Sequence, residues 1–149
     1  MFKTHTGCDF LPDQTTSTDY INIAIDAMGG DFGPSEIIPA LDLVAKGRPD
    51  VSFLVFGDEN AIKPHLSKYP NLSKRVSVRH TDKMIKNDDK PSLALRSSKG
   101  SGMRLAIEAV KSGEAKAVVS AGNTGALMAL AKMVLKTVPG IHRPAIASV

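Results

Sequence analysis

Apolar residues gather in short runs along this chain, and each run is followed by a turn and then by a stretch with helical spacing. Four runs occupy residues 21–25, 51–56, 76–78 and 118–120. They are rich in Ile, Val and Phe and nearly continuous rather than alternating, which is typical of strands buried on both faces of a sheet. A further apolar run at residues 144–149 predicts a fifth strand.

The segments between these runs predict helices. Pro34 suits the first position of a helix, and apolar side chains from Ile37 to Ala45 form one broad face. Strands that alternate with helices favour an α/β fold with a doubly wound, mainly parallel sheet and helices on both faces, similar to a Rossmann fold. The remaining helices are expected at residues 61–66, 92–98, 103–111 and 123–135.

The ends of the chain indicate how it is organised into domains. Residues 1–19 are rich in Thr and Asp with little periodic pattern, so we expect a flexible leader. The apolar run at residues 144–149 has no turn or polar cap after it, and a central parallel strand needs cover on both faces. We therefore expect residues 20–149 to be the N-terminal portion of a larger α/β domain, or a partner chain to complete the sheet.

Composition narrows the classes of function. The 149 residues carry 19 Lys and Arg against 15 Asp and Glu, and this net charge of +4 is spread along the chain. Such a charge suits an anionic substrate or an acidic partner, but with no Trp and two Tyr it does not indicate a nucleic-acid-binding surface. The single cysteine, Cys8, excludes an internal disulfide and fits a cytoplasmic setting. No apolar run approaches the roughly 18 residues that cross a bilayer, so we expect at most peripheral membrane attachment.

The strand-to-helix junction at residues 118–126 contains two glycines, Gly122 and Gly125. A strand that enters a helix through Gly-x-x-Gly lets the backbone approach a ligand, and the N–H groups of the first helical turn point at that ligand. The Asn123 amide and the Thr124 hydroxyl lie at the turn, where they can bond a phosphate or the reacting carbonyl of a substrate. The alternative is structural, because Asn and Thr are good helix caps and glycine permits tight packing.

A second glycine-rich loop, residues 26–34, follows the first strand and contains Gly29 and Gly30. Because ligands bind at the carboxyl ends of parallel strands, we expect this loop and the 118–126 junction on one rim. Neither has the Gly-x-Gly-x-x-Gly or Walker spacing, so NAD and ATP are not favoured and no cofactor is expected. Asp26 and Asp31 can organise the loop or take part in catalysis. A metal is the weakest alternative for these carboxylates, because no His or Glu lies at ligand spacing beside them.

Positive charge occurs in the segment at residues 88–99. Lys90 lies just before a predicted helix and Arg96 lies on that helix, so an anionic substrate or an acidic carrier can dock there. A solvated helix face explains the same residues equally well. His80 follows the third strand and is a candidate for proton transfer, although a lone histidine is more often structural.

Four motifs occur in order along the chain, at residues 23–31, 89–96, 119–126 and 140–145. Their sequences, IAIDAMGGD, DKPSLALR, VSAGNTGA and GIHRPA, resemble the PlsX family, the bacterial phosphate acyltransferases. Family members are a little over twice as long as this chain, so the resemblance covers roughly an N-terminal half and implies that residues 20–149 belong to a larger α/β catalytic domain. Gly102 stands where the family usually has serine, which leaves a hydroxyl role there without support.

The resemblance implies an enzyme that transfers the acyl group of acyl-acyl carrier protein to inorganic phosphate, in fatty acid and phospholipid synthesis. It further implies a fold similar to phosphate acetyltransferases and a cytoplasmic homodimer that associates peripherally with the membrane, while the present chain alone is expected to be inactive. Phosphate is already a nucleophile at neutral pH, so such an enzyme needs orientation and oxyanion stabilisation more than a side-chain nucleophile. The alternatives are a phosphate acyltransferase that uses a coenzyme A thioester, and a nucleotide-binding or regulatory α/β module.

The residues expected at this site come from the two glycine loops and the basic segment. The catalytic candidates are Asn123, Thr124 and Asp26. The substrate-binding candidates are Gly29, Gly30, Asp31, Lys90, Arg96, Ser120, Gly122 and Gly125.

Overall fold

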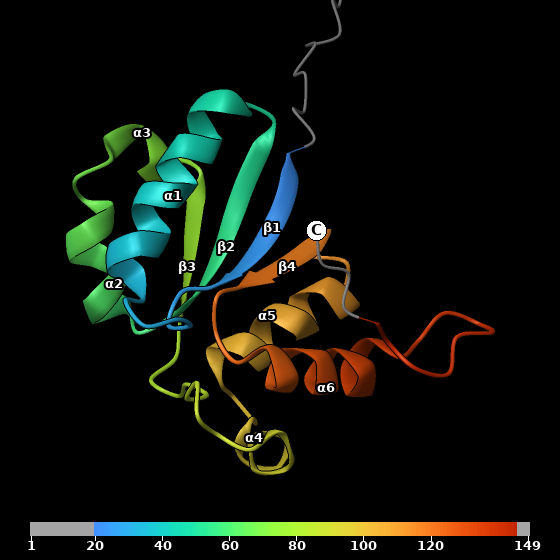
Figure 1. The fold of residues 1–149 in the computed structure, drawn as a ribbon. Helices are drawn as coiled ribbons and strands as arrows, with labels where there is room; N and C mark the ends of the chain where they lie inside the picture. The colour runs from blue at the N-terminus through green and yellow to red at the C-terminus, as the bar shows by residue number, and fades with distance from the viewer. Residues whose placement is uncertain (1–19, 146–149) are drawn as a thin grey trace, which may run out of the picture.

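The computed structural model describes residues 20–145, in which one four-stranded sheet carries helices on both faces (Figure 1). The strands are β1 (Ile21–Asp26), β2 (Val51–Gly57), β3 (Val76–His80) and β4 (Ala117–Ser120). The helices are α1 (Pro34–Gly47), α2 (Glu59–Leu66), α3 (Pro70–Ser73), α4 (Pro91–Ser97), α5 (Gly102–Lys111) and α6 (Thr124–Leu135). All strand pairs are parallel, in the order β3-β2-β1-β4. The predicted doubly wound α/β fold is therefore confirmed.

Several element bounds differ from those predicted. Helix α2 begins at Glu59 because the Asp58 carboxylate accepts the N–H of Asn60 and caps the helix. Helix α3, a single turn that opens at Pro70, is absent from the prediction because four residues give too short a periodic signal.

The predictions for the two ends of the chain can be checked only in part. Residues 1–19, predicted as a leader, lie outside the described residues. The fifth strand predicted at residues 144–149 is not seen where it can be checked, because Pro144 and Ala145 belong to no strand and the other four residues lie outside the described range.

One face of the sheet is covered by α1, α2 and α3. Because β1 and β2 alternate their side chains between the two faces, every second residue of each strand points into this layer. Its buried core consists of Ile25, Ala27, Ile38, Leu41, Val51, Phe53, Val55, Ile62 and Leu72.

Helix α5 covers the opposite face. Its Ala106 and Ala109 are buried against Ala24 of β1, and these small side chains let the helix lie close to the sheet. Helix α6 packs on α5, and α4 packs on α6 in turn (Figure 1). Leu130 of α6 and Ile107 of α5 are fully buried in that second layer, so α6 is held with its first turn at the carboxyl edge of the sheet.

Strand β1 is the central element for the site, because it pairs with β2 on one side and with β4 on the other. The register places Asp26, the last residue of β1, opposite Ser120, the last residue of β4. Strand β4 is at the edge of the sheet, and Val119 is half exposed there.

Candidate active site

The loops that follow β1 and β4 meet at the carboxyl edge of the sheet. The chain places β2 and β3 on one side of β1 and then adds β4 on the other, so the strand order reverses between β1 and β4. In open parallel sheets this reversal is where ligands bind. The expectation that the two glycine loops share one rim is confirmed by the contacts between them.

A partly buried chain of hydrogen bonds joins the two loops. The Ser120 hydroxyl donates to the Asp26 carboxylate over 2.8 Å, and its oxygen accepts the Gly122 N–H over 3.1 Å. Asp26 is 4% exposed, and this burial raises the pKa of its carboxyl, against the opposing effect of hydrogen bonds from Ser120 and from the Met28 backbone N–H. The carboxylate therefore acts on both loops at once, and the Gly122 N–H is directed inward.

Gly29 and Gly122 allow the loops to touch. A Cβ built on Gly29 would lie 2.7 Å from the backbone N of Gly122 and 3.0 Å from both Asp26 Oδ2 and Ser120 Oγ. Gly30 has a φ of 84° and its Cα faces Ala121, where a Cβ would lie 3.3 Å from the Ala121 side chain. These positions accept only glycine, which explains the glycine pair without any ligand.

The first turn of α6 leaves two backbone donors free for a ligand. Asn123 Oδ1 accepts the Ala126 N–H over 3.0 Å, and the Asn123 carbonyl accepts the Leu127 N–H. Within residues 20–145, the N–H groups of Thr124 and Gly125 have no protein acceptor. Donors of this kind at a helix N-terminus favour an anion.

The Asn123 side chain is fully engaged by the protein. Its Nδ2 donates to the carbonyl oxygens of Asp89 (2.8 Å), Asn87 (3.0 Å) and Lys86 (3.4 Å). We name residues 86–89 the strap, because Asn123 ties this turn to the start of α6. The expected amide donor for a reacting oxygen is thus used within the protein, and the capping role left open by the sequence is the one that the contacts support.

The strap also reaches the loop after β1. Asn87 Nδ2 donates to Asp31 Oδ1 over 3.0 Å, and Asp89 Oδ2 accepts the Lys86 N–H over 3.0 Å and closes the turn. Asp31, expected to bind substrate, therefore shares one of its oxygens with the strap. Both rim loops are held by the same four residues.

Lys90 and Arg96 lie on the solvent side of the strap and the two rim loops. Lys90 precedes α4, and its carbonyl accepts the N–H groups of Leu93 and Ala94. Ala94 is fully buried against α6, whereas Lys90, Leu93 and Arg96 are exposed. The basic segment is thus fixed to the helix whose first turn faces the rim, with its charges in solvent.

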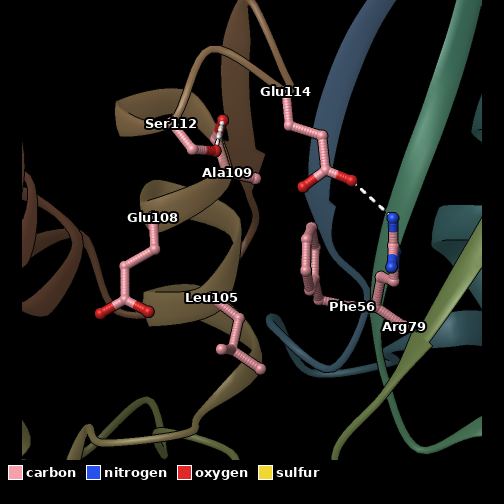
Figure 2. A pocket seen from close by; sticks show the side chains of 7 residues that line it. All are labelled: Phe56, Arg79, Leu105, Glu108, Ala109, Ser112 and Glu114. Atoms are coloured by element: carbon pink, nitrogen blue, oxygen red, sulfur yellow. Dashed lines mark hydrogen bonds and ion pairs between the residues drawn. The ribbon is translucent and has the colours of Figure 1, made fainter.

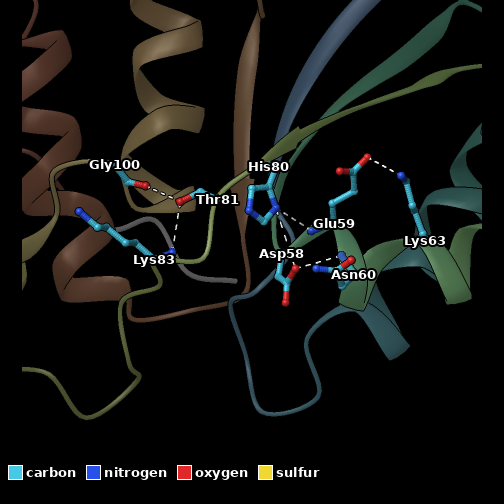
Figure 3. A network of polar contacts seen from close by, with 8 residues as sticks. All are labelled: Asp58, Glu59, Asn60, Lys63, His80, Thr81, Lys83 and Gly100. Atoms are coloured by element: carbon cyan, nitrogen blue, oxygen red, sulfur yellow. Dashed lines mark hydrogen bonds and ion pairs between the residues drawn. The ribbon is translucent and has the colours of Figure 1, made fainter.

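His80 lies at the same edge of the sheet but is engaged with α2 (Figure 3). Its Nδ1 accepts the Glu59 N–H over 3.2 Å and lies 3.9 Å from the Asp58 carboxylate. Thr81, the next residue, donates its hydroxyl to the Gly100 carbonyl over 2.6 Å. His80 therefore supports the start of α2. These contacts favour the structural role over proton transfer, the two roles that the sequence left open.

A hollow of about 390 Å³ lies on the α5 face of the sheet (Figure 2). Figure 2 shows Phe56 and Leu105 facing each other across it, while Glu114 receives a hydrogen bond from Arg79 at one side. None of the residues predicted for the site lines this hollow. Residues 20–145 also contain no group of three or more His, Cys, Asp or Glu side chains placed to hold a metal ion.

These features define an α/β protein with a candidate anion site at the point where the strand order of a parallel sheet reverses. The chain belongs to the fatty acid synthesis protein family, whose family model matches residues 21–149. The resemblance to the PlsX family is thereby confirmed.

Curated relatives agree with this assignment. The chain is 57% identical over 130 residues to a phosphate acyltransferase of Azorhizobium caulinodans, covering 87% of the chain and 37% of the relative. It is 56% identical over 126 residues to a phosphate acyltransferase of Rhodospirillum centenum, covering 85% of the chain and 36% of the relative. The chain thus spans little more than a third of the length of these relatives. None of the helices in residues 20–145 is long and apolar enough to span a membrane.

Sequence reasoning missed the strap. Asn87 was assigned no role, and Asp89 was placed only in the basic segment and in one family motif, because their contacts join residues 56 and 34 positions apart. The one available signal was the Lys-Asn-Asp-Asp composition, which is typical of a turn whose side chains bond nearby backbone.

Proposed function

We propose that the protein to which this chain belongs is a phosphate acyltransferase, which forms acyl phosphate from acyl-acyl carrier protein and inorganic phosphate. The observation that carries this proposal is the pair of N–H groups, of Thr124 and Gly125, that have no acceptor within residues 20–145 and lie beside the meeting point of the two glycine loops. The relatives are phosphate acyltransferases by name, which supports the transfer of an acyl group to phosphate. Membership of a fatty acid synthesis family gives its metabolic setting.

The transfer of an acyl group to phosphate needs no side-chain nucleophile. A phosphate oxygen attacks the thioester carbon, the new O–C bond replaces the C–S bond, and the proton of hydrogen phosphate ends on the departing sulfur. Catalysis then depends on holding a phosphate oxygen against the thioester carbon and on hydrogen-bond donors to the thioester oxygen. The backbone N–H groups of Thr124 and Gly125 and the Thr124 hydroxyl are the groups we assign to the anion.

The buried residues of the rim then have a positioning role. Asp26 and Ser120 fix the geometry of Gly29, Gly30 and Gly122 rather than meeting the phosphate, because a carboxylate repels an anion and Asp26 is buried. Asn123 holds the first turn of α6 from the side. No cofactor is needed for this chemistry.

The basic segment is the surface we assign to the carrier. Lys90 and Arg96 are exposed, and an acidic carrier protein complements them. Homodimer formation, a cytoplasmic location and peripheral membrane association complete the proposal, and they are supported by the family resemblance.

Reversing one charge on α4 tests the carrier surface. We expect Arg96→Glu to raise the apparent KM for acyl-acyl carrier protein about tenfold, because repulsion replaces attraction, and to weaken the dependence of the rate on salt. The matched control is Lys74→Glu, an exposed residue at the opposite edge of the sheet, which should leave both values unchanged. An unaltered carrier KM in Arg96→Glu removes α4 from the docking surface.

The reaction itself is tested on the full-length protein. With acyl-acyl carrier protein and phosphate, we expect acyl phosphate and free carrier thiol in equal amounts. Acyl-coenzyme A in place of the carrier substrate distinguishes the related acyltransferase, because only that enzyme favours it. Thermal stabilisation by nucleotides alone, with no acyl phosphate formed from either thioester, contradicts the proposal and indicates a nucleotide-binding module.

A further inference from the structure

We propose that the strap sets the affinity of the anion site for phosphate, with Asn87 and Asn123 as positioning residues. The inference rests on the proposed function, since it assigns a role to residues around that same site. The strap is the one described segment that bonds to both rim loops, through Asp31 on one side and Asn123 on the other.

The two attachment points lie next to the residues that form the site. Asp31 directly follows Gly30, whose Cα faces Ala121 of the opposite loop. Asn123 directly precedes Thr124, the first residue of α6. A shift of the strap therefore moves both walls of the site, and small displacements of such groups are costly in binding and catalysis.

The hydrogen bond between Asn87 and Asp31 also determines which way the negatively charged Asp31 carboxylate points. Asp31 brings a carboxylate to the rim of a site that is meant for an anion. The Asn87 amide, which donates to Oδ1 over 3.0 Å, holds that carboxylate toward the strap. Without this donor the carboxylate is free to turn toward the phosphate and repel it.

A swap of the two partners provides the test in the full-length protein, with inorganic phosphate as the varied substrate. Asn87→Asp places two carboxylates at hydrogen-bonding distance, and we expect a phosphate KM about tenfold higher with kcat nearly unchanged. Asp31→Asn alone keeps an acceptor for the Asn87 amide and removes the carboxylate from the rim, so its phosphate KM should not rise above that of the unaltered protein. The double variant restores a donor and an acceptor in exchanged positions, so its KM should return to within about threefold of that of the unaltered protein.

The matched control is Asn71→Asp, which adds the same charge at an exposed position on α3 and should not change the phosphate KM. An unchanged KM in Asn87→Asp overturns the proposal. So does a double variant as weak as Asn87→Asp alone, because the two residues are then not coupled.

A second measurement separates this proposal from the reaction. Hydrogen exchange at the Ala126 amide, which is bonded to Asn123 Oδ1, reports the first turn of α6 directly. We expect faster exchange in Asn87→Asp than in Asn71→Asp, whether or not acyl phosphate is formed. Equal exchange in the two variants overturns the role of the strap, whereas an unaltered protein that forms no acyl phosphate overturns only the proposed reaction.

Discussion

Gly29→Ala is expected to lower kcat/KM for acyl phosphate formation about 100-fold in the full-length protein, since a misplacement of about 1 Å has an effect of that size. The added Cβ would lie 2.7 Å from the Gly122 backbone N, a distance that real contacts do not allow. Its other neighbours are Asp26 and Ser120, which are bonded to each other and cannot give way separately. The loops must therefore separate, and the overpacking should also lower stability by about 1–3 kcal/mol.

Gly47→Ala is the matched control. Gly47 ends α1, and a Cβ there meets nothing within 4 Å. Activity should be unchanged and the melting temperature equal or slightly higher, because alanine restricts the unfolded chain. Steady-state kinetics and thermal unfolding measure both effects, and full activity in Gly29→Ala means that the contact between the loops is not required.

Asp26→Asn is expected to lower kcat/KM by roughly 10- to 100-fold. Asparagine offers one acceptor oxygen where the carboxylate accepts both the Ser120 hydroxyl and the Met28 N–H, so one of the two loops loses its anchor.

The same substitution should also change how the stability of the protein depends on pH. The pKa of Asp26 is raised by burial in the folded protein, so the folded state holds this proton more tightly than the unfolded state.

The sign of the pH dependence follows from that shift. The contribution of Asp26 to stability is fully present below its ordinary pKa of about 3.9 and is lost as pH rises through the raised value. The melting temperature of the unaltered protein, measured relative to Asp26→Asn, should thus fall with rising pH.

Asp50→Asn provides a control of opposite sign. The Arg48 guanidinium holds the pKa of the Asp50 carboxyl at about 2, so that stabilisation is lost as pH falls. The effect should be small because the pair is exposed. A difference between the unaltered protein and Asp26→Asn that does not vary with pH contradicts the burial of an ionisable Asp26.

The fold was predictable because its signals are local. Four apolar runs and the helical spacing between them specify a parallel α/β sheet, and glycines at two strand ends predicted that two loops lie on one rim. The meeting of the two loops followed from a general property of parallel sheets.

The sequence could not show which hydrogen-bond donors and acceptors are already bonded to other parts of the protein. Asn123 was expected to meet a substrate oxygen, yet its amide binds the strap and caps α6. Gly122 was expected to bind substrate, and the structure shows that its N–H donates to Ser120 Oγ. Such assignments depend on contacts between distant segments, and no residue pattern records them.

The bond between Ser120 and Asp26 joins residues 94 positions apart, and among the strands of residues 20–145 β4 pairs only with β1. Closing so long a loop has an entropic cost that must be met before the pairing is gained, whereas β1, β2 and β3 are linked through shorter connections. The half-sheet can therefore assemble early, while the rim exists only once β4 has docked. We therefore expect the rim to form late in folding, after β1, β2 and β3 have paired.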